Sequence, residues 1–240
     1  MKRLLLSSLL LLSACGVPGP DENPFDEEVG KADSLTTLTK LVYVSGVAHD
    51  LETDYIPNVI QCENGGAPYQ SKMAQAIAAR TFLVATTNGK DSPSIGSGQQ
   101  WQVYSCGKTP NADDLRAAQD TAGMILHWTQ PLAGGKSKTW VTSGQFVAGA
   151  KLDANCNIVS DATNTERFVT DNEALSGSAI HFAPRPLADP SSPRNRGCMG
   201  QNMANCLATH WDYQASDILR YFYGLDIQFP ESIDRDPPAQ

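Results

Sequence analysis

The clearest periodic pattern lies in the stretch SKMAQAIAARTFLVATTNG, which starts at Ser71. Met73 and Ile77 recur at helical spacing, and the glutamine and alanines around them have high helix propensity. The pattern therefore predicts a helix that begins at Ser71 and ends at Asn88-Gly89.

Weaker patterns predict further elements on both sides of this helix. Residues 38–47 and 100–105 are β-branched and aromatic enough for strands, and 55–61 is a short apolar segment. The other predicted elements are a helix over 112–121 with Asn111 as its N-cap, strands over 124–128 and 139–142 joined by a turn, a loop-rich stretch from 144 to about 193, and helices over 202–210 and 214–223. Because strands and helices mix without a βαβ rhythm, the predicted fold class is α+β.

The first fifteen residues have the features of a lipoprotein signal peptide. Lys2 and Arg3 precede the apolar run Leu4–Leu12, which is too short to span a bilayer. Leu12-Ser13-Ala14 then leads to Cys15, as in a bacterial lipobox, so we expect Cys15 to be lipidated and to anchor the protein in the cell envelope. The alternative is an ordinary secretory signal with a chance cysteine.

Composition divides the rest of the chain into three parts. Residues 16–37 are rich in Pro, Gly and acidic residues and predict a disordered linker, and 229–240 predicts a flexible tail. The residues between them, 38–228, are enough for one domain with a sizeable core.

Charge and cysteine content narrow the functional classes. The formal net charge is −8, and the chain has no basic cluster, so it is a poor candidate for binding nucleic acid. Five cysteines remain beyond Cys15, and an oxidising envelope compartment favours disulfides. We expect a Cys198–Cys206 bridge first and a Cys62–Cys106 bridge second, which leaves the fifth cysteine, at position 156, unpaired.

Glu63 is the only acidic residue between Asp54 and Asp91, and it stands between an apolar run and a Gly-Gly-Ala-Pro turn. Burial next to apolar groups raises the pKa of a lone carboxyl, because desolvation penalises the charged form. Such a group can carry a proton near neutrality and give it to a leaving oxygen, as a glycosidic general acid does. The alternative is a solvated surface glutamate, which is what most glutamates are.

The stretch DLETDYIPNVIQCENGGAPYQSKMAQAIAARTFLVAT resembles the signature of the SpoIID/LytB family, in which a strand-like segment leads to a glutamate and then to a helix ending in KAQAIAARTYAL. Later pieces are similar to family motifs in the family's order: QVY, LRAAQDTAGMILHW, TWVTSG and YQASDILRYFYGLDI. The resemblance covers about residues 38–228.

This resemblance implies a peptidoglycan lytic transglycosylase that needs no cofactor or metal. Glu63 matches the family's catalytic acid and Arg80 its helix arginine, which would bind a sugar group or orient Glu63. A single carboxyl suffices for this reaction because the sugar's own C6 hydroxyl is the nucleophile, whereas hydrolytic glycosidases commonly pair two carboxylates. The alternative for Arg80 is a structural salt bridge.

The chain also departs from the family pattern. Asn64-Gly65 stands where the family has Met-Pro, and the motif GHGVGMSQWGA appears only as RNRGCMGQNMA, with Asn195 in place of the histidine. Gln201 is the best retained groove residue of that motif. Tyr104 and Ser143 are further candidates for substrate binding, and structural hydrogen bonding is the alternative for all three.

Three classes of function therefore stay open: a glycan-cleaving enzyme, a non-catalytic glycan-binding or amidase-accessory lipoprotein of the same fold, and a structural envelope protein. Glycan strands are the expected partner, with a cell-wall amidase as a further partner in the second class. Less supported chemistries are a Cys62 thiol nucleophile with a histidine base, and zinc held by Cys198, Cys206 and His210, whose cysteine spacing is not that of a structural site.

Overall fold

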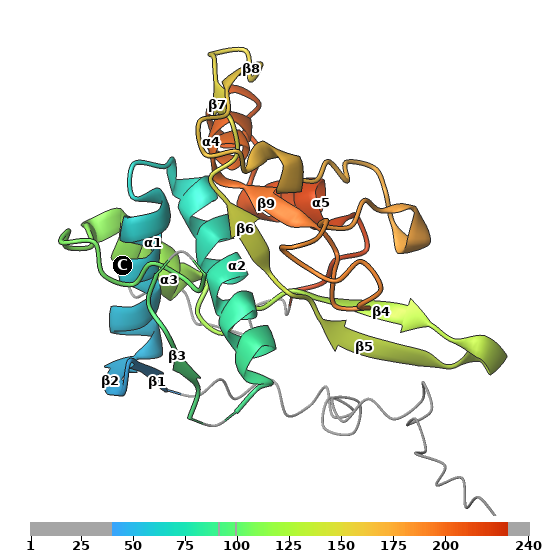
Figure 1. Cartoon of the computed structure of the whole chain (residues 1–240), viewed down its shortest axis with the longest axis horizontal. Coiled ribbons are helices and arrows are strands. Elements are labelled where there is room, and N and C mark those ends of the chain that lie inside the picture. Colours follow the sequence, from blue (N-terminus) through green and yellow to red (C-terminus); the bar gives the residue numbers. More distant parts are fainter. Residues whose placement is uncertain (1–39, 91, 99, 230–240) are drawn as a thin grey trace, which may run out of the picture.

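The computed structural model describes residues 40–90, 92–98 and 100–229. The expected signal peptide with Cys15, the linker over 16–37 and nearly all of the tail lie outside the described residues. Within them, helices and short strands mix in an α+β arrangement, as predicted, and no barrel forms (Figure 1). None of the described helices combines the length and apolar character needed to cross a bilayer.

The elements alternate along the chain without a regular repeat. The helices are η2 (Leu51–Tyr55, a π-helix), α1 (Ile56–Asn64), α2 (Tyr69–Thr87), α3 (Ala112–Asp120), η3 (Ala133–Gly135), η4 (Glu166–Phe168), η5 (Gly177–Ala179), α4 (Gln201–His210) and α5 (Ala215–Tyr223). The strands are β1 (Leu41–Val44), β2 (Val47–Asp50), β3 (Ser94–Ile95), β4 (His127–Pro131), β5 (Ser137–Val141), β6 (Gln145–Val147), β7 (Lys151–Leu152), β8 (Ile158–Ser160) and β9 (Cys198–Gly200).

Helix α2 is the central element of the domain. It is buried on almost every side, because small alanines let α1 and α3 approach one face while α4, α5 and β6 cover another. The helix ends at Asn88, whose left-handed backbone (φ 53°) suits asparagine. Lys72 on α2 and Asp114 on α3 form a buried ion pair at 2.8 Å that joins these two helices.

The strands of the described residues form four small sheets rather than one large sheet. Strand β1 lies between antiparallel β2 and parallel β3, β4 pairs with β5 as a projecting hairpin, and β7 pairs with β8. The parallel pair β6–β9 joins segments more than fifty residues apart, and β9 leads directly into α4, which packs against α2 (Figure 1). Two apolar clusters pack on opposite sides of α2, one with α1 and β1 and the other with α4 and α5.

Several predicted elements are confirmed. These are the long helix, the helix capped by Asn111, the hairpin and the two C-terminal helices. Asn111 accepts hydrogen bonds from the backbone N–H groups of Asp113 and Asp114, in a capping box.

Two expectations about local structure are wrong. The apolar segment that ends in Glu63 is helix α1, where the family resemblance implied a strand-like segment; Pro57 occupies the first turn, in which a missing N–H costs no helical hydrogen bond. Residues 100–105 form no strand, only an isolated bridge between Ser97 and Gln102. The side chain of Gln102 is instead committed to the core, where it accepts from Tyr55 at 2.6 Å.

The disulfide assignment is half correct. Cys62 bonds to Cys106 as expected, but the second bridge joins Cys156 to Cys206, and Cys198 is the free, buried cysteine among the described residues. The Cys198–Cys206 expectation fails because Cys198 lies inside β9, while Cys206 lies on α4 beside the β7–β8 hairpin that carries Cys156. Proximity in sequence was a poor guide, since one residue lies in a strand and the other in the helix that follows it.

Candidate functional site

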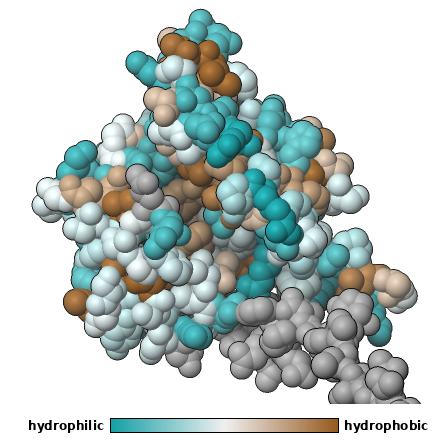
Figure 2. All heavy atoms as spheres, in the orientation of Figure 1, coloured by the Kyte–Doolittle hydropathy of each residue, from teal (hydrophilic) through white to brown (hydrophobic). Residues whose placement is uncertain are grey.

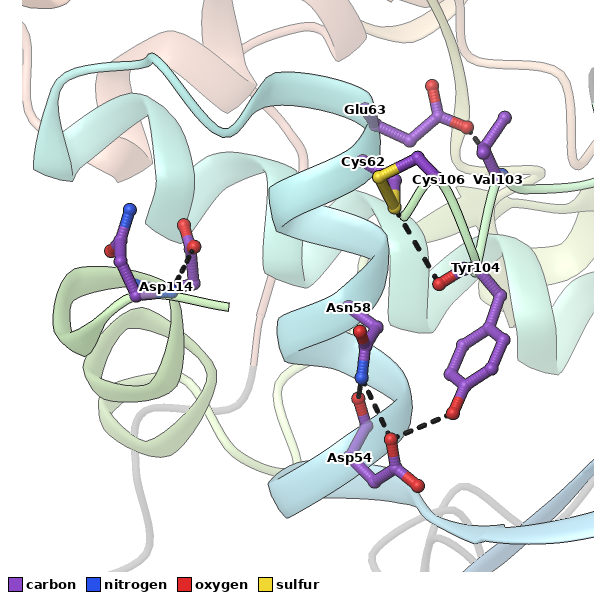
Figure 3. The surroundings of a disulfide bond; sticks show 9 residues. Asp54, Asn58, Cys62, Glu63, Val103, Tyr104, Cys106 and Asp114 are labelled. Carbon is purple, nitrogen blue, oxygen red and sulfur yellow. Dashed lines mark hydrogen bonds between the residues drawn. A yellow bond between two sulfur atoms is a disulfide. The ribbon is translucent and has the colours of Figure 1, made fainter. Parts of the chain in front are cut away.

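Glu63 lies in the last turn of α1, and its side chain points toward the segment after β3 (Figure 3). One carboxylate oxygen, Oε1, accepts a 2.6 Å hydrogen bond from the backbone N–H of Val103, and Oε2 lies 3.5 Å from the amide nitrogen of Gln201. Burial raises the pKa of the Glu63 carboxyl, and the two hydrogen bonds oppose this because they stabilise the charged form. The result is a sheltered carboxyl that takes up a proton more readily than an exposed glutamate.

Gln201 is far from Glu63 in the sequence, and its side chain lies next to the Glu63 carboxyl in the folded structure. It begins α4 directly after β9, and its side chain is 5% exposed. The same amide nitrogen lies 3.2 Å from Oε1 of Gln75, which is fully buried on α2. The Gln75 amide nitrogen has no hydrogen-bond partner among the described residues. The structure thus brings Glu63 and Gln201 together and adds Gln75 behind them.

Gln75 is a site residue that was not predicted from the sequence. The available signal was its position: a polar residue inside a stretch of alanines that all face the interior. Buried polar side chains are normally hydrogen-bonded, so a glutamine there indicates a polar neighbour within the core.

The Cys62–Cys106 disulfide fixes the position of the Val103 N–H, which donates a hydrogen bond to Glu63. Cys62 precedes Glu63 on α1, and Cys106 follows Val103 by three residues, so the bridge ties the segment that carries the Val103 N–H to the helix that carries the acid (Figure 3). This covalent tie also excludes Cys62 as a thiol nucleophile.

The turn after Glu63 is fixed by a polar cluster. Asn64 and Asn205 exchange side-chain hydrogen bonds of 3.0 and 3.1 Å, and Ser71 donates to Asn205 at 2.6 Å. The cluster joins the end of α1, the first turn of α2 and the middle of α4. Asn64, which replaces the family's methionine, therefore has a structural role beside the acid.

Arg80 does not lie at this site. Its side chain is fully buried and forms two hydrogen bonds with the carboxylate of Glu52, at 2.7 and 3.0 Å, and a third with the carbonyl of Met124 at 3.0 Å. The structure thus forms the salt bridge that was the alternative to a sugar-binding role, because the arginine emerges on the side of α2 that faces η2 and α3.

Neither the Tyr104 nor the Ser143 side chain forms a hydrogen bond with the Glu63 carboxyl. The Tyr104 ring points toward Asp54, to which its hydroxyl donates at 2.8 Å (Figure 3). Ser143 keeps a backbone bond to the Arg194 carbonyl at 2.7 Å, and its buried hydroxyl has no partner among the described residues. Of the three predicted groove residues, only Gln201 contacts the acid.

Asn195, which stands at the family's histidine position, organises a loop. Its side-chain oxygen accepts a hydrogen bond from the Ala183 N–H at 3.0 Å, and its side-chain nitrogen donates to the Ala183 carbonyl at 2.9 Å. The same nitrogen also donates to the Asp189 carbonyl. It is 1% exposed. The side chain at this position is therefore an amide that holds the loop backbone.

No group of three or more His, Cys, Asp or Glu side chains lies close enough to hold a metal ion within the described ranges. The suggested zinc set is excluded more directly, because Cys206 is in a disulfide.

Residues 46–128 match the family model described as SpoIID, Stage II sporulation protein. The match runs from β2 to β4 and contains Glu63, and it supports membership of the chain in the SpoIID/LytB family. That family is associated with cell-wall lytic activity. The comparison with curated proteins found no match.

Proposed function

We propose that the chain is an envelope-anchored lytic transglycosylase-like enzyme that cleaves peptidoglycan glycan strands with Glu63 as its single acid/base. The observation that carries this proposal is the state of Glu63. Its carboxyl is partly buried, its pKa is raised by that burial, and no lysine, arginine or histidine pairs with it in the described part of the chain. A carboxylate locked to a cation would stay charged, whereas this one can hold the proton that the reaction requires.

The reaction needs two proton transfers through the same group. Protonated Glu63 gives its proton to the glycosidic oxygen as the bond between that oxygen and C1 breaks. The carboxylate then removes the proton from the C6 hydroxyl of the same sugar while that oxygen forms a new bond to C1. The product has a 1,6-anhydro end, Glu63 is again protonated, and no water is consumed.

The hydrogen bonds to Glu63 suit this double role. The N–H of Val103 and the amide of Gln201 both stabilise the carboxylate that exists between the two transfers. Burial favours the protonated form that starts the cycle. Because the hydrogen bonds and the burial act in opposite directions, Glu63 can adopt both the ionised and the protonated state.

The test is digestion of purified sacculi, and of glycan strands without stem peptides, with the domain over 38–228. Mass spectrometry should find 1,6-anhydro ends with the wild type and not with Glu63→Gln. Glu173→Gln is the matched control, because it makes the same change on an exposed glutamate and should leave the product unchanged. Equal product from Glu63→Gln would exclude Glu63 as the acid.

A second candidate is a glycan-binding or amidase-accessory lipoprotein with the same fold. It is favoured by Asn195, whose amide is committed to the loop backbone where the family motif carries a histidine. Sacculus binding without anhydro ends, equal in wild type and Glu63→Gln, would support this candidate over the enzyme.

A further inference from the structure

A row of three polar side chains leads from the acid into the core. The Glu63 carboxyl contacts the amide of Gln201, and that amide contacts Gln75 of α2. Gln75 is fully buried, and its helix neighbours Ala74 and Ala76 belong to the two apolar clusters on opposite sides of α2. Figure 2 shows apolar side chains also in the hollow beside α2 on this face of the molecule. Because a fully buried amide cannot bond to bulk water, its neighbours in the protein decide its orientation.

Both contacts of Gln201 use the same atom. Its amide nitrogen lies 3.5 Å from Oε2 of Glu63 and 3.2 Å from Oε1 of Gln75. An amide nitrogen carries two hydrogens, so it can donate to both oxygens at once. This arrangement suits an ionised Glu63, since a carboxylate only accepts hydrogen bonds. It leaves the amide nitrogen of Gln75 without a partner among the described residues.

A protonated Glu63 requires the opposite arrangement. With the proton on Oε2, this oxygen is a donor, and it would face the nitrogen of Gln201, which is also a donor. Rotation of the Gln201 amide by half a turn places its oxygen at the shared position, where it accepts from Glu63. That oxygen would then face the Gln75 oxygen, so the Gln75 amide must rotate as well and present its nitrogen. The terminal torsion of glutamine is broad and roughly two-fold, so both rotations leave the rest of each side chain in place.

The rotated arrangement gives the Gln75 nitrogen the partner that it otherwise lacks. The nitrogen would donate to the Gln201 oxygen, and the Gln75 oxygen would become the unpaired atom instead. A buried carbonyl without a partner is more often tolerated than a buried N–H without one, so Gln75 favours the protonated state of Glu63. Gln201 favours the ionised state, because its charge-assisted bond to the carboxylate is the stronger of the two that it can form with Glu63.

The charge that the two amides face is that of Glu63 itself. The neighbouring group that responds to this charge is Tyr55 of η2, whose pKa is raised by burial and further by Glu63, and whose hydroxyl donates to Gln102. In the described part of the chain, the other ionisable side chains on η2, α2, α3, α4 and the segment over 102–106 form no hydrogen bond or ion pair with Glu63; these are Glu52, Asp54, Tyr69, Lys72, Arg80, Tyr104, Asp113, Asp114, Arg116, Asp120 and His210.

We propose that Gln75 and Gln201 are a pair of positioning residues whose amides rotate together with the protonation state of Glu63, so that Gln201 donates to the carboxylate and accepts from the protonated carboxyl. The catalytic consequence rests on the proposed function, in which Glu63 gives up a proton and then regains it. Each rotation supplies the hydrogen bond that the next state of the acid needs.

The test is a pH titration of the protein, with both disulfides formed, followed by nuclear magnetic resonance. The side-chain amide signals of Gln75 and Gln201 should move with the same midpoint as the carboxyl carbon of Glu63, and they should stay constant in Glu63→Gln. Gln102 is the matched control in the same spectra, because it is also fully buried and both ends of its amide have partners in the core. Its signals should move far less, since those partners do not change.

Gln75→Met tests whether Gln75 acts on the acid. The substitution removes both ends of the amide and keeps the length of the side chain. It should lower the pKa of Glu63, because the support for the protonated form is lost. The missing amide signal of this variant also identifies the Gln75 signal in the wild type. An unchanged or raised pKa of Glu63 would overturn the proposal, and so would wild-type Gln75 signals that move no more than those of Gln102, which needs no variant that folds.

These outcomes separate the inference from the proposed function, because the titration requires no substrate. Coupled titration of the two amides and Glu63, with no anhydro product from the wild type, supports the amide pair and removes the enzyme. Anhydro product together with a Gln75 signal that does not titrate supports the enzyme and overturns the amide pair.

Discussion

The ion pair between Arg80 and Glu52 offers the sharpest test of how the site is built. We predict that Glu52→Gln destabilises the fold and leaves the chemistry of Glu63 intact. The substitution keeps the shape of the side chain and removes the negative charge. It leaves the Arg80 guanidinium, which is fully buried, with only neutral acceptors such as the Met124 carbonyl.

The magnitude follows from burial. Removing one partner of a buried ion pair costs about 3–5 kcal/mol, because the remaining charge is left desolvated. Glu52 itself is 27% exposed, so water can enter from its side, and we expect the lower end, about 3 kcal/mol. For a urea dependence of about 1–3 kcal/mol per molar, the unfolding midpoint should fall by ~1–3 M.

The assay is urea unfolding followed by circular dichroism, with Arg116→Gln as control. Arg116 pairs with Asp120 at 3.5 Å, and both side chains are largely exposed, so this loss should cost less than about 1 kcal/mol. Glycan cleavage is then measured in the absence of urea, where folded Glu52→Gln should act like the wild type. Equal midpoints for the two variants would refute the burial argument, and loss of cleavage in a stable Glu52→Gln would return Arg80 to the active site.

Three further predictions follow from the acid and the disulfides. Glu63→Gln should match the wild type in stability below pH 4.5 and become the more stable of the two as the pH rises from there through the raised folded-state pKa, above which the difference stays constant, because ionisation is costlier in the native state; calorimetric melting across pH would show this, and a pH-independent difference would contradict it. Gln201→Leu removes a hydrogen bond to the Glu63 carboxylate, so the basic limb of the cleavage pH profile should move to higher pH; a downward shift would be inconsistent with the geometry. Replacing Cys156 and Cys206 by Ser should cost about 4 kcal/mol of stability for a loop of this length, measured by urea unfolding under oxidising conditions, and an unchanged midpoint would contradict it.

The sequence predicted well wherever one local pattern decided the outcome. The spacing of Met73 and Ile77 located α2, and Asn111 located the start of α3. The isolation of Glu63 between apolar residues and a turn predicted a sheltered carboxyl whose pKa is raised. In each case the determining interactions lie within a few residues of one another.

The sequence was a poor guide to side-chain partners that are set by contacts between distant segments. Arg80 could have faced Glu63 or an ion pair, and only the rotation of α2 against η2 and α3 selects Glu52. Cys156 meets Cys206 because the β7–β8 hairpin folds over α4. The hydrogen bond between Gln75 and Gln201 joins residues that are far apart in the sequence, so the role of Gln75 is visible only in the folded structure.

One covalent loop has a consequence for how the protein matures. The Cys62–Cys106 bridge and the hydrogen bond from Val103 to Glu63 close a ring through the acid itself. A newly made chain with free thiols would hold that ring by hydrogen bonding alone, and loss of the donor would push the carboxyl further toward its protonated state. Oxidation of the two cysteines would therefore fix the hydrogen-bond donor that sets the pKa of the acid.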